Sequence, residues 1–303
     1  MMVMGRCLYL HYVPSRMLGG GTFRRRRRQS GSISDPRGRH IISFPGLPLR
    51  MLLLLLFPML FPLSPGAQAG EIIGGREARP HSRPYMAFVT IAREEKGAKM
   101  CGGFLIREDV VVTAAHCNRK FGNISVLLGA HNVEIDEPGT QKISVHHRIP
   151  HPEFNDATLE NDIMLLQLRD KAKLTVTVGT IPLPDKRVRE GAVCCVAGWG
   201  LTSTNANAQR SPTLQEVKLK VMSKGVCLSR FYPYYVPSRM LCVGDPQERN
   251  ASFKGDSGGP LVCDGKAQGI VSYGRDDGSA PNVFTKVSKY VSWIKKTLRK
   301  LKP

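Results

Sequence analysis

The segment ASFKGDSGGPLVC (Ala251–Cys263) places one serine, Ser257, among glycines and directly after Asp256. Glycines on both sides let the backbone approach a bound molecule closely and turn its amides toward it. Acyl transfer by a serine also needs a base, a group that holds the base, and donors for the oxyanion. Ser257 is therefore a candidate nucleophile, and the N–H groups of Gly255 and Ser257 are candidate oxyanion donors.

Two earlier segments supply the missing parts. His116 ends an apolar run in TAAHC, beside Cys117, and Asp162 comes just ahead of the apolar run IMLLQL. That position suits a carboxylate withdrawn from water and bonded to an imidazole. A lone histidine after a strand is more often structural, and an Asn-Asp pair can simply cap a strand. The order His116, Asp162, Ser257, with all three segments complete, favours a catalytic triad.

With these motifs the chain resembles the chymotrypsin-like serine proteases, from Ile72 to the C-terminal helix, which is about three quarters of the sequence. The resemblance implies an all-β fold: two antiparallel Greek-key β-barrels with a C-terminal α-helix and the triad in the cleft between the barrels. It makes His116 the general base, Asp162 its orienter and Ser257 the nucleophile. The implied enzyme is a serine endopeptidase that works through an acyl-enzyme and needs no cofactor.

Short apolar segments, rich in Val and Ile and separated by turn residues, also favour barrels or sandwiches. They cover residues 85–92, 101–106, 109–115, 124–130, 163–168, 192–200, 214–222, 260–263, 267–274 and 282–287. One helix is predicted at the C-terminus. Its apolar stripe at helical spacing consists of Val287, Tyr290, Val291, Ile294 and Leu298.

The chain divides into an upstream extension (1–50), a signal peptide (51–69), an activation dipeptide (70–71) and the peptidase domain (72–303), with the barrel boundary near 180–190. The extension is expected to be disordered or not translated. The signal is an apolar run that begins at Met51 and closes on Ala67-Gln68-Ala69. This run is too short and too rich in proline to span a membrane, so the signal predicts secretion.

IIGG (Ile72–Gly75) adds an activation mechanism by the same resemblance. Cleavage before Ile72 frees an α-amine, which pairs with Asp256 and turns the Gly255 amide into the oxyanion hole. The form that retains Gly70-Glu71 is expected to be nearly inert. That acidic dipeptide, together with PHSRPYMAF, HNV, IPHPEFND and SFKGDSGG, is similar to granule proteases: granzymes, cathepsin G, mast-cell chymases and duodenase. Storage in secretory granules is the implied location.

Eight cysteines in a chain with a secretory signal indicate disulfide bonds. The granule group implies the pairs Cys101–Cys117, Cys194–Cys263 and Cys227–Cys242. It lacks a bridge beside the specificity pocket, where this chain has Phe253. Cys7 lies in the extension. Cys195 doubles a cysteine of the group's pattern, and we interpret it as a buried free thiol; an intermolecular bridge or an exchange of roles with Cys194 are the alternatives.

The resemblance assigns substrate-binding residues by position: Ala251, Ser272, Tyr273, Gly274, Asn282 and Lys254. Ala251 at the pocket base excludes a trypsin-like carboxylate, and Gly274 leaves the mouth open. We expect cleavage after large apolar or aromatic residues, with Asn282 favouring P1 side chains that hydrogen-bond, such as Tyr, Met or Asn. Weak activity on all substrates is the alternative. Lys254 and Arg275 indicate acidic residues near the scissile bond, unless they are solvated rim charges.

The formal net charge is +20, and ten of the 44 basic residues precede Ile72, among them Arg24–Arg28. An excess of 12 positive charges remains in the peptidase domain, which favours polyanions such as a heparin-like proteoglycan. One rival hypothesis is a basic heparin-binding or antimicrobial protein with little activity, which the complete triad disfavours. Another is a nucleic-acid-binding protein, but a start at Met51 removes the arginine run.

By the resemblance the partners are protein or peptide substrates and serpin-type inhibitors; we expect no specific nucleic acid, no membrane span and a monomer. Asn123 lies in a glycosylation sequon in a loop. The sequon at Asn250 is expected to be empty, because a glycan there would collide with substrate. His146, His147 and His151 lack the spacing of a metal site, so we expect surface histidines and no metal.

Overall fold

The computed structural model describes residues 72–92, 98–118, 122–230 and 232–301. The sequence predictions for the extension, the signal peptide, the activation dipeptide and Cys7 lie outside these residues.

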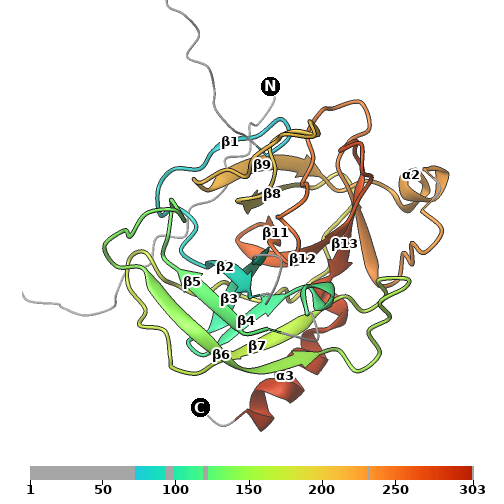
Figure 1. Cartoon of the computed structure of the whole chain (residues 1–303). Helices are drawn as coiled ribbons and strands as arrows, with labels where there is room; N and C mark the ends of the chain where they lie inside the picture. Colours follow the sequence, from blue (N-terminus) through green and yellow to red (C-terminus); the bar gives the residue numbers. More distant parts are fainter. Residues whose placement is uncertain (1–71, 93–97, 119–121, 231, 302–303) are drawn as a thin grey trace, which may run out of the picture. The chain divides into compact units, whose positions relative to one another are not determined.

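The first barrel is built from six antiparallel strands (Figure 1). They are β2 (Met86–Ile91), β3 (Lys99–Arg107), β4 (Val110–Thr113), β5 (Ile124–Leu128), β6 (Gln141–Pro150) and β7 (Met164–Leu168). The barrel closes in the order β2-β3-β4-β7-β6-β5. Its core includes side chains without exposed surface, among them Phe104, Leu105 and Met164.

The second sheet contains seven strands. They are β1 (Arg76–Glu77), β8 (Val193–Gly198), β9 (Gln215–Lys220), β10 (Met240–Val243), β11 (Pro260–Cys263), β12 (Lys266–Tyr273) and β13 (Asn282–Lys286). The order is β1-β9-β8-β11-β12-β13-β10, and β1 pairs only with β9. The ends of β9 and β10 meet at the bridge Val221–Val243, flanked by hydrogen bonds from Met222 N to Cys242 O and from Gly244 N to Lys220 O, both 2.8 Å.

The two sheets share one connectivity. When β2 to β7 and β8 to β13 are each numbered from one to six, neighbouring strands follow the same cyclic order, 1-2-3-6-5-4. In the first barrel every step of this order is a ladder, whereas in the second the step from β9 to β10 is the single bridge. The prediction of two antiparallel Greek-key barrels is thereby confirmed.

All ten apolar segments of the sequence form strands, and three further strands were missed. Within β6 only Ile143 is buried, so its sequence QKISVHHRIP has no apolar run. β10 is four residues long and β1 has two exposed residues, too few for a periodic signal.

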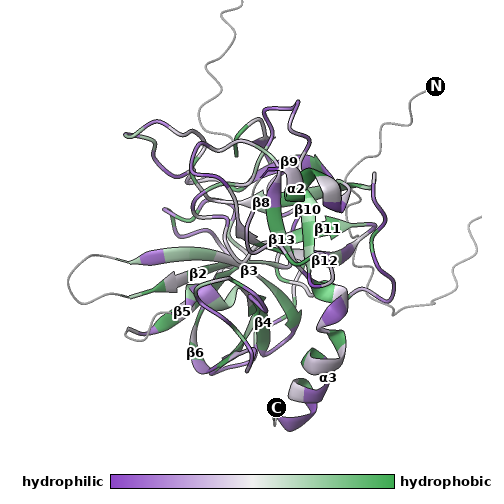
Figure 2. Ribbon diagram, turned by 90° about the vertical axis from the view of Figure 1, so that its right-hand side faces the viewer, coloured by the Kyte–Doolittle hydropathy of each residue, from purple (hydrophilic) through white to green (hydrophobic). Residues whose placement is uncertain are grey.

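The C-terminal helix returns from the second sheet to the first barrel. The 3₁₀ turn η2 (Val287–Lys289) leads into α3 (Val291–Lys300). Of the predicted stripe, Val287, Tyr290 and Ile294 are buried in the core cluster of the first barrel and Leu298 packs against it, whereas Val291 is only half-buried. Figure 2 shows the strands as mainly hydrophobic and α3 with both hydrophobic and hydrophilic residues. No helix among the described residues is both long and apolar enough to span a membrane.

Three disulfides match the predicted pairs: Cys101–Cys117, Cys194–Cys263 and Cys227–Cys242, the last attaching α2 (Lys224–Ser229) to β10. Consecutive residues of a strand point to opposite faces, so only Cys194 of the doublet reaches Cys263. The interpretation of Cys195 as a free thiol is wrong, because this buried side chain is disulfide-bonded, to a partner outside the described residues.

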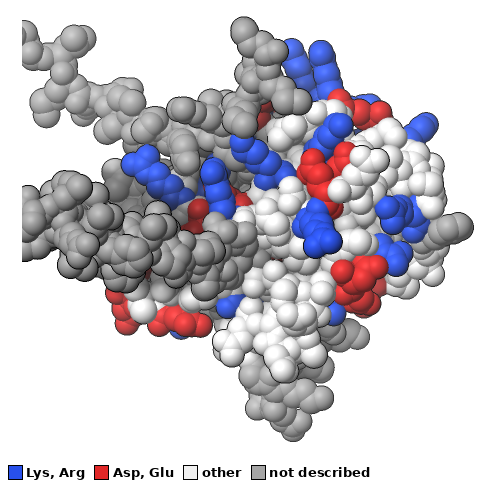
Figure 3. Space-filling model, turned by 90° about the horizontal axis from the view of Figure 1, so that it is seen from above, with Lys and Arg blue, Asp and Glu red and all other residues white. Residues whose placement is uncertain are grey.

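Charges of both signs are spread over the surface. On the face drawn in Figure 3, lysine and arginine side chains are interspersed with aspartate and glutamate. The excess positive charge of the chain therefore does not form one continuous basic field on this face.

Candidate active site

His116 lies in a short 3₁₀ turn, η1 (Ala115–Cys117), that follows the fully buried strand β4. Cys117 in the same turn is bonded to Cys101 of β3. The carbonyl of His116 also accepts a hydrogen bond from Lys99 Nζ at 3.3 Å. The backbone that carries the imidazole is thus attached to the barrel wall at several points.

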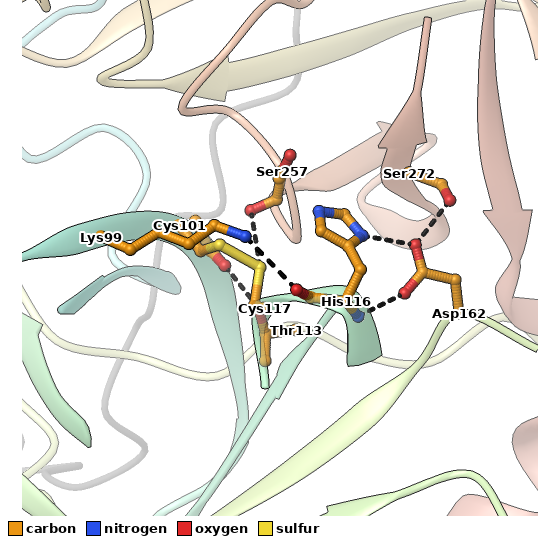
Figure 4. The surroundings of a disulfide bond; sticks show 9 residues. Lys99, Cys101, Thr113, His116, Cys117, Asp162, Ser257 and Ser272 are labelled. Atoms are coloured by element: carbon orange, nitrogen blue, oxygen red, sulfur yellow. Dashed lines mark hydrogen bonds and ion pairs between the residues drawn. A yellow bond between two sulfur atoms is a disulfide. The ribbon is translucent and has the colours of Figure 1, made fainter. Parts of the chain in front are cut away.

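Asp162 holds the imidazole (Figure 4). Its side chain has no exposed surface; Oδ2 lies 2.7 Å from His116 Nδ1, and Oδ1 accepts the His116 backbone N–H at 2.9 Å. A carboxylate only accepts hydrogen bonds, so Nδ1 carries the proton and Nε2 is left as the acceptor. This is the tautomer that a general base needs.

The second barrel fixes Asp162 from the other side. Ser272 Oγ of β12 donates to Asp162 Oδ2 at 2.5 Å, and Thr285 Oγ1 of β13 donates to the Asp162 carbonyl at 2.8 Å. Sequence reasoning assigned Ser272 to a pocket wall and missed Thr285 altogether. The only available signal was that both residues lie in predicted strands, and this does not show to which acceptor their hydroxyl groups donate.

Ser257 lies in the turn before β11 and is half-buried. Its carbonyl accepts the N–H of Gly102 in β3 at 2.8 Å, which joins the second barrel to the first. Next to it, Gly258 has φ +86°, and a Cβ there would lie 2.2 Å from Thr113 Oγ1, so only glycine fits. In Figure 4 the His116 ring lies between Ser257 and Asp162. The described residues include no hydrogen bond from Ser257 Oγ to His116; such bonds are often formed only with substrate bound.

The backbone amides of Gly255 and Ser257 are not paired with any acceptor among the described residues. Asp256, Gly258 and Gly259 donate their N–H groups to Phe253 O, Val271 O and Asp256 O, at 3.0, 2.9 and 2.9 Å. Gly255 and Ser257 are both half-buried, so their two N–H groups without acceptors in one turn can receive an oxygen with negative charge.

Asp256 is completely buried. Its carboxylate accepts the backbone N–H groups of Gly200 and Phe253, each at 2.9 Å. Burial raises the pKa of Asp256 to about 6; the two hydrogen bonds and the charge of Arg210 act in the opposite direction. Within the described part of the chain no cation forms an ion pair with this carboxylate. A buried carboxylate without a counter-ion is costly, so this site calls for a positive group.

Ile72 is also buried, with no exposed surface, and packs in the core of the second barrel. Arg210 lies near the Asp256 side: a Cβ on Gly255 would be 3.7 Å from its Cζ, and its Nη1 is buried without an acceptor in the described residues. Burial lowers the pKa of Arg210, and the Asp256 charge raises it. Arg210 was not identified from sequence, because it lies in a loop without a motif.

The proposed pocket residues divide into buried and exposed ones. Ala251, Ser272 and Asn282 are buried, Tyr273 is half-buried, and Gly274 is exposed. The two flanking cations are each paired, Lys254 with Asp276 at 3.2 Å and Arg275 with Asp277 at 3.0 Å. These pairs reduce the free positive charge that the sequence suggested beside the cleft.

The remaining predicted residues lie apart from this centre. Asn123 is exposed at the start of β5, and Asn250 packs with its side-chain oxygen against Gly74. The rings of His146 and His147 are 4.0 Å apart, and His151 packs against Tyr290 and Trp293.

Comparison with known proteins fits this geometry. The trypsin family model matches residues 72–294. Mast cell protease 3 of Ovis aries is 52% identical over 254 residues, 83% of this chain and 98% of that protein. Human granzyme B is 53% identical over 253 residues (82% and 98%), and human cathepsin G is 50% identical over 252 residues (82% and 95%). A solved structure called "Structure of GrC" is 49% identical with a TM-score of 0.71, covering 75% of this chain and all of the other.

These matches extend over the whole two-barrel unit, with His116, Asp162 and Ser257 inside the matched range. They confirm the resemblance to granzymes, cathepsin G, chymases and duodenase. The chain belongs to the trypsin family and is a serine endopeptidase.

Proposed function

We propose that Ser257 attacks the scissile carbonyl, that His116 Nε2 takes its proton and later gives it to the leaving amine, and that Asp162 stabilises the imidazolium. Water then hydrolyses the acyl-enzyme by the same proton transfers. The observation that carries this is the Asp162–His116 bond of 2.7 Å, together with the amides of Gly255 and Ser257, which have no acceptor among the described residues. These amides would bind the oxyanion of the tetrahedral intermediate.

Activation follows from the same residues. Cleavage between Glu71 and Ile72 would free an α-amine, a group that ordinarily has a pKa of about 8 and is therefore largely protonated at neutral pH. The buried carboxylate of Asp256 is its proposed partner. Such a pair would hold the turn from Gly255 to Ser257 with both amides directed at the substrate.

The P1 side chain would enter beside Ser257, against Ala251, Tyr273, Gly274 and Asn282. An alanine at the base supports a preference for large apolar or aromatic P1 residues over basic ones. Lys254 would lie at the rim and contribute little, because it is exposed and already paired.

Secretion through the signal that begins at Met51 and storage in granules belong to the same proposal, with serpin-type inhibitors as regulators and a monomer as the active form. The exposed position of Asn123 supports a glycan there. Three disulfides within the described residues support an oxidising compartment.

A polyanion such as a heparin-like proteoglycan is the proposed storage partner, and a groove of about 400 Å³ between β6, β7 and the end of α3 supports it. Its charged or titratable lining consists of His146, His147, Arg169, Lys171, Lys300 and Asp109. Asp109 is bonded to Arg107, so the groove is basic in balance. The triple change of Arg169, Lys171 and Lys300 to Ala should lower the salt concentration that elutes the protein from immobilised heparin. Unchanged elution would contradict this site.

The catalytic proposal is tested by labelling the chain, cleaved before Ile72, with a serine-directed fluorophosphonate and by profiling it on a peptide library. We expect covalent labelling that disappears in Ser257→Ala and persists in Ser292→Ala, a change on the exposed side of α3. A cleaved chain that takes no label would contradict the proposed mechanism and favour the rival, a basic binding protein with little activity.

A further inference from the structure

A cavity of about 240 Å³ lies between the segment that joins β6 to β7, the end of the loop before β10, and the start of α3. Its described lining includes no residue of the proposed triad or of the proposed substrate pocket. One lining residue is Asn161, which is 5% exposed and directly precedes Asp162. Its Oδ1 accepts the Tyr290 hydroxyl at 3.0 Å, and its Nδ2 donates to the Glu153 carbonyl at 2.8 Å. A molecule in this cavity would therefore contact the segment that carries Asp162.

Three ring side chains line the cavity together. The centroid of the His151 ring lies 5.0 Å from that of Trp293 and 5.3 Å from that of Tyr290. Trp293 is half-buried, whereas Tyr290 is only 4% exposed, so the indole has more surface left for a ligand. Aromatic rings pack well against one another in offset or edge-to-face arrangements. This part of the lining suits a planar apolar group.

The polar groups of the lining are mostly hydrogen-bond donors. His151 Nδ1 accepts the backbone N–H of Glu153 at 3.2 Å, and burial lowers the pKa of His151, so the neutral ring carries its proton on Nε2. This N–H, the hydroxyl of Ser238 and the ammonium of Lys289 have no acceptor among the described residues. Arg239 bonds to a glutamate outside the lining through Nη1 alone. The cavity therefore offers donors to an acceptor-rich group.

The charge around the cavity is positive in balance. Burial lowers the pKa of Lys286, and the nearby charges of Lys289 and Arg187 lower it further. None of these three cations forms an ion pair within the part of the chain that the structure describes. The carboxylate in the described lining is that of Glu153, which is exposed. Cations that gather without counter-ions favour an anion.

We infer that this cavity binds a small aromatic anion: a single ring that lies against Trp293 and carries a phosphate or sulfate group within reach of Lys289 and Arg239. Such a group has three terminal oxygens, which can accept hydrogen bonds from several sides. The volume of about 240 Å³ is below the range of about 300–1,000 Å³ that is typical for drug-sized ligands, so the ligand is small. This site goes beyond the proposed function, because the described residues of the polyanion groove and of the substrate pocket are different ones.

The experiment is isothermal titration calorimetry of the chain cleaved before Ile72, at constant ionic strength, with phenyl phosphate and with phenyl sulfate. We expect saturable binding at least about tenfold tighter than that of inorganic phosphate or phenol, each of which supplies half of the contacts. Lys289→Ala should weaken binding about tenfold, because a charge-assisted hydrogen bond is lost. Trp293→Leu should weaken it by a similar factor. Lys295→Ala, the same change at an exposed position of α3, should leave it unchanged.

The outcomes decide between this cavity and other places. No saturable binding of either ester, or binding that Lys289→Ala leaves unchanged, overturns the inference. In peptide hydrolysis, competitive inhibition with a Ki equal to the measured Kd would place the ligand beside Ser257 and overturn it as well. If Trp293→Leu fails to fold, Lys289→Ala carries the test, because Lys289 is exposed and tolerates truncation.

Discussion

The first barrel closes through six ladders, whereas the second closes where β9 meets β10 at the single bridge Val221–Val243. The difference extends to the parts of the site that each barrel carries. On the first, His116 is hydrogen-bonded through its ring and its backbone to the same carboxylate. On the second, the turn around Ser257 has two unpaired amides and a buried carboxylate without a cation among the described residues.

This contrast supports the proposal that the base is preformed, while the oxyanion site depends on a group from outside the turn. The base side is anchored within its own barrel and by Ser272 and Thr285. On the side of the proposed nucleophile, the buried carboxylate of Asp256 has no ion pair with any cation among the described residues. On this proposal, cleavage before Ile72 would act on the second barrel, and the following changes test it.

The largest effect on kcat is expected for Ser257 and His116, the proposed nucleophile and base. Ser257→Ala removes the nucleophile and should lower kcat by about 10⁶-fold, and His116→Ala should cost about as much, because nucleophile and base act as a unit. Single-turnover assays of the cleaved chain measure this. A double variant much slower than either single variant would show that the two residues act independently.

Cleavage before Ile72 should produce the next largest effect. The chain that retains Gly70-Glu71 should have kcat/KM lower by about 10²- to 10³-fold, the loss expected when an oxyanion donor is misplaced. Asp256→Asn in the cleaved chain should cause a similar loss. Equal activity of the cleaved and uncleaved chains would contradict the division between a preformed base and a dependent oxyanion site.

The pH dependence of stability tests the buried carboxylate directly. Folding raises the pKa of Asp256 from 3.8 to about 6, so the folded state is favoured when this group is protonated. Below about pH 4, Asp256 does not lower the free energy of unfolding. Above pH 6, the buried carboxylate lowers it by roughly 3 kcal/mol. We therefore compare two uncleaved proteins, the unmodified chain and Asp256→Asn. As the pH rises from 4 to 7.5, the variant should become increasingly more stable than the unmodified chain.

Urea unfolding of both uncleaved proteins across this range measures the difference, in which the titration of other groups cancels. A stability difference that stays constant with pH would show that Asp256 already has a counter-charge. Arg210→Gln offers a second comparison: because the Arg210 charge lowers the pKa of Asp256, its loss should enlarge the pH-dependent penalty.

A smaller effect is expected for Ser272→Ala. The hydroxyl bonds to Asp162, so its loss should reduce kcat about tenfold and leave KM nearly unchanged. Steady-state kinetics on one peptide separate these constants, with Ser292→Ala as the matched control. A raised KM with unchanged kcat would return Ser272 to the pocket-wall role that its sequence position suggested.

The smallest effect is expected at the rim. Lys254 is 62% exposed and paired with Asp276, so Lys254→Ala should change kcat/KM by less than about threefold, even for substrates with acidic residues near the scissile bond. Raising the ionic strength should remove what difference there is. A larger, salt-resistant loss would show that the pair opens to bind substrate.

The predictable parts of this molecule are those carried by a few neighbouring residues. The ten apolar segments and the helical stripe from Val287 to Leu298 are patterns of neighbouring residues. The segments form the expected strands, and the stripe lies in η2 and α3. The strand β6 was missed because only one of its residues, Ile143, is buried, so its sequence has no apolar run. The triad was identified by three short motifs in a particular order.

Other features depend on partners far apart in the chain. Whether Cys194 or Cys195 pairs with Cys263 depends on the register of β8 against β11: Val262 is paired with Cys195, so Cys194 comes opposite Cys263. Ser272 and Asp162 are 110 positions apart, and the direction of their hydrogen bond decides between two roles for the serine. No local pattern contains that direction.

By itself, the sequence determined the all-β class, because residue type and local periodicity are sufficient for it. The triad residues and the apolar pocket base at Ala251 are predictions that the sequence makes through its resemblance to the family. Only the tertiary structure decided that, among the described residues, the amides of Gly255 and Ser257 have no acceptor and Asp256 is buried without an ion pair. The physical reason is that hydrogen-bond direction and burial depend on atoms brought together from both barrels.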